Sequence, residues 1–160
     1  DSFDVIDFGA KGNGIDDDSA AFEAAIAAVS ENQGGQVVVP EGVFLIRPIN
    51  LTSSMELFIR SGATIRGMAN TSAWPIIAPV PSYGQGRDMN PHSARYTSLL
   101  HGVNVSSVTI RGEGLRSVVD GQGDYWYNRS RAFLYESCKE CPDTRWCCLN
   151  NTRGHLIEFM

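Results

Sequence analysis

The sequence lacks the features that would place it in a membrane or on nucleic acid. Its 160 residues contain no run of 18 or more apolar residues, so no membrane span is expected. Positive charge is also scarce, because 13 lysines and arginines stand against 18 acidic residues and give a net charge of −5. Such a balance argues against non-specific binding of nucleic acid. No signal peptide is visible at Asp1, as expected for a processed N-terminus or for a boundary within a longer chain.

Helical periodicity is scarce too, and only one stretch near the start shows it clearly. Phe22, Ile26 and Val29 recur at i, i+4 and i+7, which predicts an amphipathic helix. Asp18 is the predicted N-cap, with its carboxylate accepting the free backbone N–H groups of the first turn. The pair at 34–35, both glycine, is predicted to end the helix. Residues 1–36 are therefore expected to form a strand and a capping helix.

The remaining apolar segments are short and follow one another closely. Strands are predicted at 37–39, 43–46, 49–51, 57–59, 63–65, 98–100 and 108–110, and from 118 onwards. The turns between them are too short for crossover helices, and such strands are typical of a solenoid that adds one coil at a time. Val37 and Leu57 begin similar segments 20 residues apart, which lies in the range of β-helix coils. We predict an all-β fold, a right-handed parallel β-helix (solenoid) with one N-terminal capping α-helix.

The predicted organisation is a single β-helix domain over residues 1–160. The first coils occupy 37–126 and include a long loop at 68–97, a cysteine-containing insertion follows at 127–154, and 155–160 start a further coil. A solenoid that stopped at this last strand would expose unpaired backbone groups and an open core, whereas natural solenoids end in a polar cap. We therefore expect this chain to be the N-terminal part of a domain truncated at its C-terminal end.

Several side chains outside the apolar pattern are candidates for a site. The aromatic residues Trp74, Tyr83 and Tyr96 of the long loop could stack on sugars or could pack as a surface flap. Asp120 and Asp124 could form an acid–base pair, but aspartate before glycine is a common turn former, and we favour the turn.

Arginine dominates the positive charge, since 11 of the 13 basic residues are arginine. Arginine pairs with carboxylates through two parallel hydrogen bonds. Arg60, Arg66 and Arg111 could line one face of the coils and bind an acidic polysaccharide. The alternative is that they are ordinary solvated arginines.

Two features predict an extracellular protein. Five of the nine asparagines begin Asn-x-Ser/Thr sequons, the acceptors of N-linked glycans: Asn50, Asn70, Asn104, Asn128 and Asn150. The four cysteines are Cys138, Cys141, Cys147 and Cys148. Their spacing does not match zinc sites, so disulfides and no metal are expected. Pairing Cys138 with Cys141 would force a strained bond between the adjacent Cys147 and Cys148, which favours pairs between the two clusters.

Five segments together resemble a known family. Residues 7–14 and 17–22 are similar to the N-terminal signature of the pectin-lyase-like β-helix superfamily. Residues 112–114, 120–126 and 153–159 resemble glycoside hydrolase family 28, the polygalacturonases. The resemblance implies a secreted, cell-wall enzyme that cleaves α-1,4-galacturonan by inversion, without a cofactor and as a monomer when complete. In such enzymes one carboxylic acid protonates the leaving oxygen while another group activates water.

The catalytic motifs of that family are absent from this chain. Asn151-Thr152 is followed by Arg153 rather than aspartate, Leu100 stands where a Gly-His-Gly motif needs glycine before His101, and no Arg-Ile-Lys occurs. We therefore assign no catalytic residue here, leave the substrate-binding residues open, and expect the carboxylates beyond residue 160. The 160 residues alone are predicted not to hydrolyse pectin.

Two other functions stay open. The chain could belong to a non-catalytic β-helix module that binds acidic polysaccharide, through arginines such as those above. It could also belong to a rhamnogalacturonan hydrolase or lyase of the same fold. A lyase would need a basic residue near a Ca²⁺ site, and no ligand cluster is visible in the sequence.

Overall fold

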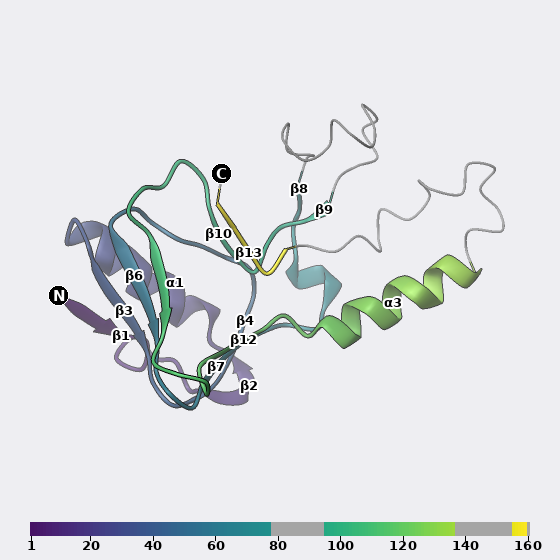
Figure 1. Ribbon diagram of the computed structural model, residues 1–160, viewed down its shortest axis with the longest axis horizontal. Coiled ribbons are helices and arrows are strands. Elements are labelled where there is room, and N and C mark those ends of the chain that lie inside the picture. The colour runs from purple at the N-terminus through teal and green to yellow at the C-terminus, as the bar shows by residue number, and fades with distance from the viewer. Residues whose placement is uncertain (78–94, 137–154, 160) are drawn as a thin grey trace. The chain divides into compact units, whose positions relative to one another are not determined.

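The computed structural model describes the backbone of residues 1–77, 95–136 and 155–159, and the side chains of 1–77, 96–129 and 155–159 (Figure 1). The chain divides into two compact units. The coil unit comprises Asp1–Met68, Ser98–Gly121 and Leu156–Met160, and the insertion unit comprises Ala69–Thr97 and Gln122–His155. Within the described ranges, no helix is both long and apolar enough to cross a membrane.

The coil unit consists of three sheets in which every strand pairs in parallel with its neighbours. Sheet A contains, in order, β1 (Ser2–Asp4), β3 (Gly35–Val39), β6 (Met55–Ile59) and β11 (Thr109–Gly112). Sheet B contains β12 (Val118–Asp120), β7 (Ala63–Gly67), β4 (Gly42–Ile46) and β2 (Asn13–Asp17). Sheet C contains β13 (Ile157–Phe159), β10 (Leu100–Gly102) and β5 (Ile49–Asn50).

Successive strands along the chain belong to sheets A, B and C in that order, and each set of three strands forms one coil. The coils are β3-β4-β5, β6-β7-β10 and β11-β12-β13. Val37 lies opposite Leu57 in the register of sheet A, so the predicted 20-residue spacing is the length of the first coil. The prediction of a right-handed parallel β-helix is confirmed, and its hand is the one that parallel crossovers adopt. β10 begins at Leu100, two residues later than predicted.

Apolar side chains stack in register inside the coils and form the core. One pair from each sheet shows this: Val37 with Leu57, Phe44 with Ile65, and Ile49 with Leu100, all at most 1% exposed. Because successive side chains of a strand point to opposite faces, the residues between them in each strand face outward. The described core is therefore the space enclosed by the three sheets.

Helix α1 (Ser19–Glu31) closes the N-terminal end of this core. It follows β2, at the point where a sheet C strand follows sheet B in the later coils, and it contacts β1, β3 and β5. The predicted stripe of Phe22, Ile26 and Val29 is buried, as a capping helix requires. The prediction of an N-terminal capping helix is confirmed.

The two ends of α1 differ from prediction in detail. Asp18 is the N-cap residue, but its carboxylate makes no capping bond to the first turn. It accepts instead from the backbone N–H groups of Lys11 (2.7 Å) and Gly12 (3.2 Å), because the preceding loop folds back over it. At the other end the left-handed residue is Gln33, with φ 61°, and the N–H of Gly34 donates to Val29 in a Schellman motif.

Asp17 connects the helix start to the first coil. Its Oδ1 accepts from the backbone N–H and the hydroxyl of Ser19, and its Oδ2 lies 3.2 Å from Nε of Arg47. Partial burial by itself would raise the pKa of Asp17, but the bonds from Ser19 and the charge of Arg47 outweigh it and lower the pKa below 3.8.

This contact predicts a small pH effect on stability. A carboxylate whose pKa is lowered by folding stabilises the fold above its unfolded pKa, and the contribution disappears as pH falls through the folded value. We expect Asp17→Asn to flatten the pH dependence of the free energy of unfolding below about pH 4, by less than about 1 kcal/mol because the pair is partly solvated. Denaturant unfolding between pH 2 and 7 measures this. Asp7→Asn, at an exposed position, is the control, and an equal flattening there would contradict the assignment.

The insertion unit contains two segments that both leave the coils between sheet B and sheet C. The first contains the 3-10 helix η1 (Thr71–Ala73) and the antiparallel pair β8 (Ile76–Ile77) and β9 (Arg95–Tyr96). The second contains helix α3 (Gly123–Glu136). Sequence reasoning missed this second helix, because its sequence is largely polar and shows no wide apolar stripe. Among its side chains described, Trp126 is the buried one.

Candidate functional site

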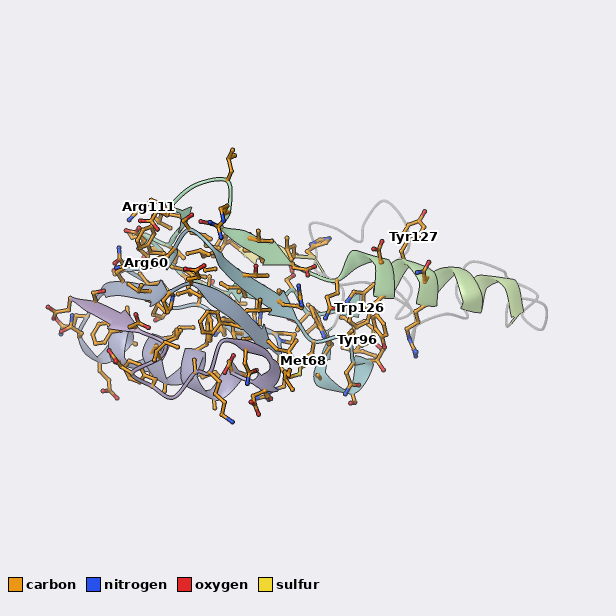
Figure 2. All side chains as sticks on the ribbon, turned by 90° about the horizontal axis from the view of Figure 1, so that it is seen from below. Arg60, Met68, Tyr96, Arg111, Trp126 and Tyr127 are labelled. Carbon is orange, nitrogen blue, oxygen red and sulfur yellow. The ribbon has the colours of Figure 1, made fainter. Side chains whose placement is uncertain are left out.

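The three arginines considered as one ligand-binding face do not all lie on one sheet. Arg66 belongs to sheet B, where its Nε lies 2.9 Å from Oδ2 of Asp120 in the next coil. Arg111 belongs to sheet A, where it bonds to Glu56 and its guanidinium carbon lies 3.9 Å above the ring of Phe58. Arg60 follows β6 and is exposed (Figure 2). Of the two alternatives, a common arginine face is not supported, because Arg66 and Arg111 lie on different sheets and pair with acids of neighbouring coils.

The interpretation of Asp120 as structural is supported by the same ion pair. Its carboxylate is paired with Arg66 within the coil unit, and Asp124 is an exposed residue in the first turn of α3. Nothing in their described contacts favours an acid–base pair.

The aromatic residues of the long loop pack rather than face solvent. Trp74 and Tyr96 are each 5% exposed, and their ring centres lie 5.1 and 5.4 Å from that of Trp126. Tyr96 and Trp126 are labelled in Figure 2, within the insertion unit. Sugar stacking by Trp74 and Tyr96 is therefore wrong, and the packed flap is confirmed for them. Tyr83 lies outside the described residues.

Glycosylation at the five sequons stays a prediction. Four begin at exposed asparagines: Asn50, Asn70, Asn104 and Asn128. In the Asn70 sequon the side-chain carbonyl accepts from the backbone N–H (3.1 Å) and the hydroxyl (2.8 Å) of Ser72. Asn150 and the four cysteines, Cys138, Cys141, Cys147 and Cys148, lie outside the described residues.

One polar row crosses the outer face of sheet C. Asn50 lies opposite His101, and His101 opposite Glu158, in the parallel register of β5, β10 and β13. The preceding residues Ile49 and Leu100 are buried in the core, so strand alternation directs Asn50 and His101 outward. We call Asn50, His101 and Glu158 the sheet C row. Neighbouring members are about 4.7–4.9 Å apart in backbone position, the spacing of paired strands.

Ser98 holds two members of the row in place. It is fully buried, and its hydroxyl donates to Oε2 of Glu158 (2.8 Å). Its carbonyl oxygen lies 3.0 Å from Nδ1 of His101. A carbonyl oxygen can only accept, so Nδ1 carries a proton in this bond, and Nε2 is the acceptor of the neutral ring. Ser98 therefore orients the side chains of His101 and Glu158.

Sequence reasoning missed this row, because its members are 51 and 57 residues apart and only the coil register brings them together. The available signal was a polar residue inside two apolar segments, His101 after Leu99-Leu100 and Glu158 after Leu156-Ile157. Among the residues that the structure describes, no three histidine, cysteine or acidic side chains are grouped to hold a metal ion.

The architecture described above is that of a parallel β-helix protein with a capping helix and with insertions at one corner of the coil. The chain matches, over residues 2–117, the family described as "Rhamnogalacturonase A/epimerase, pectate lyase-like". Because this match covers most of the chain, the chain belongs to that family.

Similar proteins include two groups of enzymes. A probable polygalacturonase of Vitis vinifera is 39% identical over 162 residues, which cover 99% of this chain and 29% of that protein. Mannuronan C5-epimerase AlgE5 of Azotobacter vinelandii is 33% identical over 128 residues, 79% of this chain and 12% of that protein. The crystal structure of an exopolygalacturonase from Thermotoga maritima superposes with a TM-score of 0.65 at 28% identity, over 82% of this chain and 28% of that one.

These similarities confirm the resemblance to polygalacturonases and the β-helix fold. The chain spans less than a third of the length of each of these three proteins. The family match over residues 2–117 contains the capping helix and the first coils, and the similar proteins include enzymes of two different chemistries.

Proposed function

We propose that the protein containing this chain is a glycosidase that hydrolyses α-1,4-linked galacturonan by inverting acid–base catalysis. The observation that carries the proposal is the 39% identity to the probable polygalacturonase of Vitis vinifera, which extends over 99% of the chain. It includes the second insertion, whereas the epimerase similarity covers 79% of the chain. The similarity thus favours hydrolysis over epimerisation.

In this proposal the coils carry the scaffold and the catalytic carboxylates lie outside residues 1–160. None of the family's catalytic motifs occurs in the sequence. An inverting enzyme needs two carboxyl groups about 6.5–9.5 Å apart to admit a water. Asp120, the acid first considered for such a pair, is bonded to Arg66.

The alternatives are less well supported. A module that binds acidic polysaccharide through arginines is disfavoured by the pairing of Arg66 and Arg111 with Asp120 and Glu56. A rhamnogalacturonan hydrolase or lyase of the same fold would share this scaffold, and the reaction products distinguish it.

Secretion into the cell wall, glycosylation and disulfide bonds complete the proposal, with pectic polysaccharide as the partner and a monomer as the active form. Exposure of Asn50, Asn70, Asn104 and Asn128 supports glycosylation, because an acceptor asparagine must lie at the surface.

The test is to incubate the protein from its native source with polygalacturonate. We expect new reducing ends whose first-formed anomer is inverted, measured by proton NMR, without the ultraviolet absorbance of an unsaturated lyase product. The 160-residue chain alone is expected to release none. Absorbance of an unsaturated product, or release of reducing ends from rhamnogalacturonan only, would contradict the proposal.

A further inference from the structure

The sequence contains one Asn-Gly pair, Asn13-Gly14, and it lies at the start of β2. Asn13 is exposed, and Gly14 has a φ of 72°, in the left-handed region. Glycine has no side chain to keep its backbone nitrogen away from a neighbouring group. The side-chain amide of Asn13 is therefore within reach of attack by the nitrogen of the residue that follows it.

The reaction at such a pair is deamidation, and water is its sole co-reactant. The backbone nitrogen of Gly14 bonds to Cγ of Asn13, and the bond from Cγ to Nδ2 breaks. The amide nitrogen leaves as ammonia and takes the proton of the Gly14 N–H, so a cyclic imide remains. Water then opens this ring at either carbonyl and yields aspartate or isoaspartate, with no oxidation or reduction.

Hydrogen bonds at both polar atoms hold the Asn13 amide in place. Nδ2 donates to Oδ2 of Asp16 (2.7 Å), and Oδ1 accepts from the backbone N–H groups of Ile15 (3.0 Å) and Asp16 (3.0 Å). The bonds from Asn13 and Lys11 lower the pKa of Asp16 below its usual value, so this acceptor is ionised at neutral pH. Because these bonds fix the amide, the reaction proceeds from the fraction of molecules in which the segment is open.

The segment that contains Asn13 covers the first coil. A Cβ added at Gly12 would lie 2.8 Å from the ring of Phe44, so the backbone packs closely on that side chain. The carbonyl of Gly12 accepts from the N–H of Val43 (2.8 Å), and Asn13 lies opposite Val43 in the register of β2 and β4. The aspartate product has a carboxylate in place of the Nδ2 donor, beside the carboxylate of Asp16. Like charges repel, so the product cannot restore this bond.

We propose that Asn13 is a site of spontaneous deamidation, controlled by opening of residues 9–17, and that its products loosen this segment over the first coil. The inference is independent of the proposed function, since it concerns the stability of the coil end. Asn32 is the internal reference. It is also exposed, and its Nδ2 also donates, to the carbonyl of Gly34 (2.7 Å), but the residue that follows it is Gln33.

The first experiment incubates the complete protein at mildly alkaline pH and measures conversion of Asn13 and Asn32 by mass spectrometry of their peptides. We expect Asn13 to convert at least about tenfold faster, because the side chain of Gln33 hinders the attack at Asn32. Asp16→Ala removes the acceptor of Nδ2 and should speed conversion of Asn13 about fivefold, the factor that one hydrogen bond contributes. Lys11→Ala leaves the bonds of Asn13 in place and is the matched control, expected within about twofold of wild type.

The second experiment measures amide hydrogen exchange in Asn13→Asp, which carries the aspartate product. Exchange at the N–H groups of Gly12 and Val43 should accelerate about tenfold relative to wild type. Asn32→Asp makes the same change of charge at the reference site and should leave these two groups unchanged.

Three outcomes would overturn the inference. Equal conversion of Asn13 and Asn32 in the wild-type protein removes the site, and this comparison needs no variant to fold. Equal rates in Asp16→Ala and Lys11→Ala remove the control by the Asp16 bond. Unchanged exchange at Gly12 and Val43 in Asn13→Asp shows that the product does not loosen the segment. None of these outcomes bears on the cleavage of galacturonan, so the proposed function is tested separately.

Discussion

Trp126→Ala is expected to lower the stability of the insertion unit by about 3–5 kcal/mol, the usual cost of truncating a buried aromatic residue. Trp126 is 8% exposed, and its ring centre lies within 5.4 Å of those of Trp74, Tyr96 and Tyr125. Trp74 and Tyr96 come from the first insertion and Trp126 from the second. The substitution therefore removes the ring on which both insertions pack.

The effect should be local. Amide hydrogen exchange is expected to accelerate at residues 71–77 and 95–97, in the first insertion, and to stay unchanged in β3, β6 and β7, because local openings follow cooperative units. Tyr127→Ala is the matched control, since Tyr127 is the next residue of α3 and is 53% exposed (Figure 2). Equal exchange in the two variants would show that the aromatic cluster does not hold the unit.

Phe22→Ala is the second large effect and concerns the capping helix. Phe22 is fully buried, and its ring centre lies 5.9 Å from that of Phe44 in β4, with the planes at 66°. The substitution removes apolar contacts and an edge-to-face pair, so the free energy of unfolding should fall by about 3–5 kcal/mol. Chemical denaturation followed by circular dichroism measures the fall.

Glu23→Ala is the control for this helix. Glu23 is the next residue of α1 and is exposed, so its replacement should change the free energy of unfolding by less than about 0.5 kcal/mol. If Phe22→Ala cost no more than Glu23→Ala, the helix would not be part of the cooperative core, and its role as a cap would be wrong.

Local patterns predicted the coil unit well, for a physical reason. The stripe of α1 and the apolar strands depend on burial within one element, which sequence periodicity reports directly. The coil length followed from the spacing of Val37 and Leu57, because a solenoid repeats its own geometry. Features that depend on one segment can thus be predicted before the fold is known.

Features that depend on a partner in another segment could not be predicted in the same way. Asp18 was expected to cap its own helix, but the loop containing Lys11 and Gly12 offers it two N–H groups. Arg66 and Arg111 were considered either as ligand-binding residues or as solvated ones, but acids of adjacent coils pair with them. In both cases the partner lies outside the residue's own element, in the loop before β2 for Asp18 and in the adjacent coil for Arg66 and Arg111.

The candidate site shows the same limit more strongly. In the sequence, Leu100 before His101 breaks a catalytic motif, and Glu158 lies in a segment that resembles the family, and neither residue is marked as part of a site. Their common position on sheet C follows from register and from Ser98, neither of which a single segment encodes. A site assembled across coils needs the coils to be aligned first.

The corner between sheets B and C has a consequence for how such chains can vary. In the first coil, Arg47 and Pro48 alone connect β4 to β5, so two residues suffice to close the circuit. In the next two coils the same corner is spanned by residues 68–99 and 121–156. Strand pairing in the coils does not constrain the length of these connections, so this corner can gain or lose whole segments while the register of the three sheets stays the same. Chains of this fold can therefore differ in length and sequence at one corner without any change in the core.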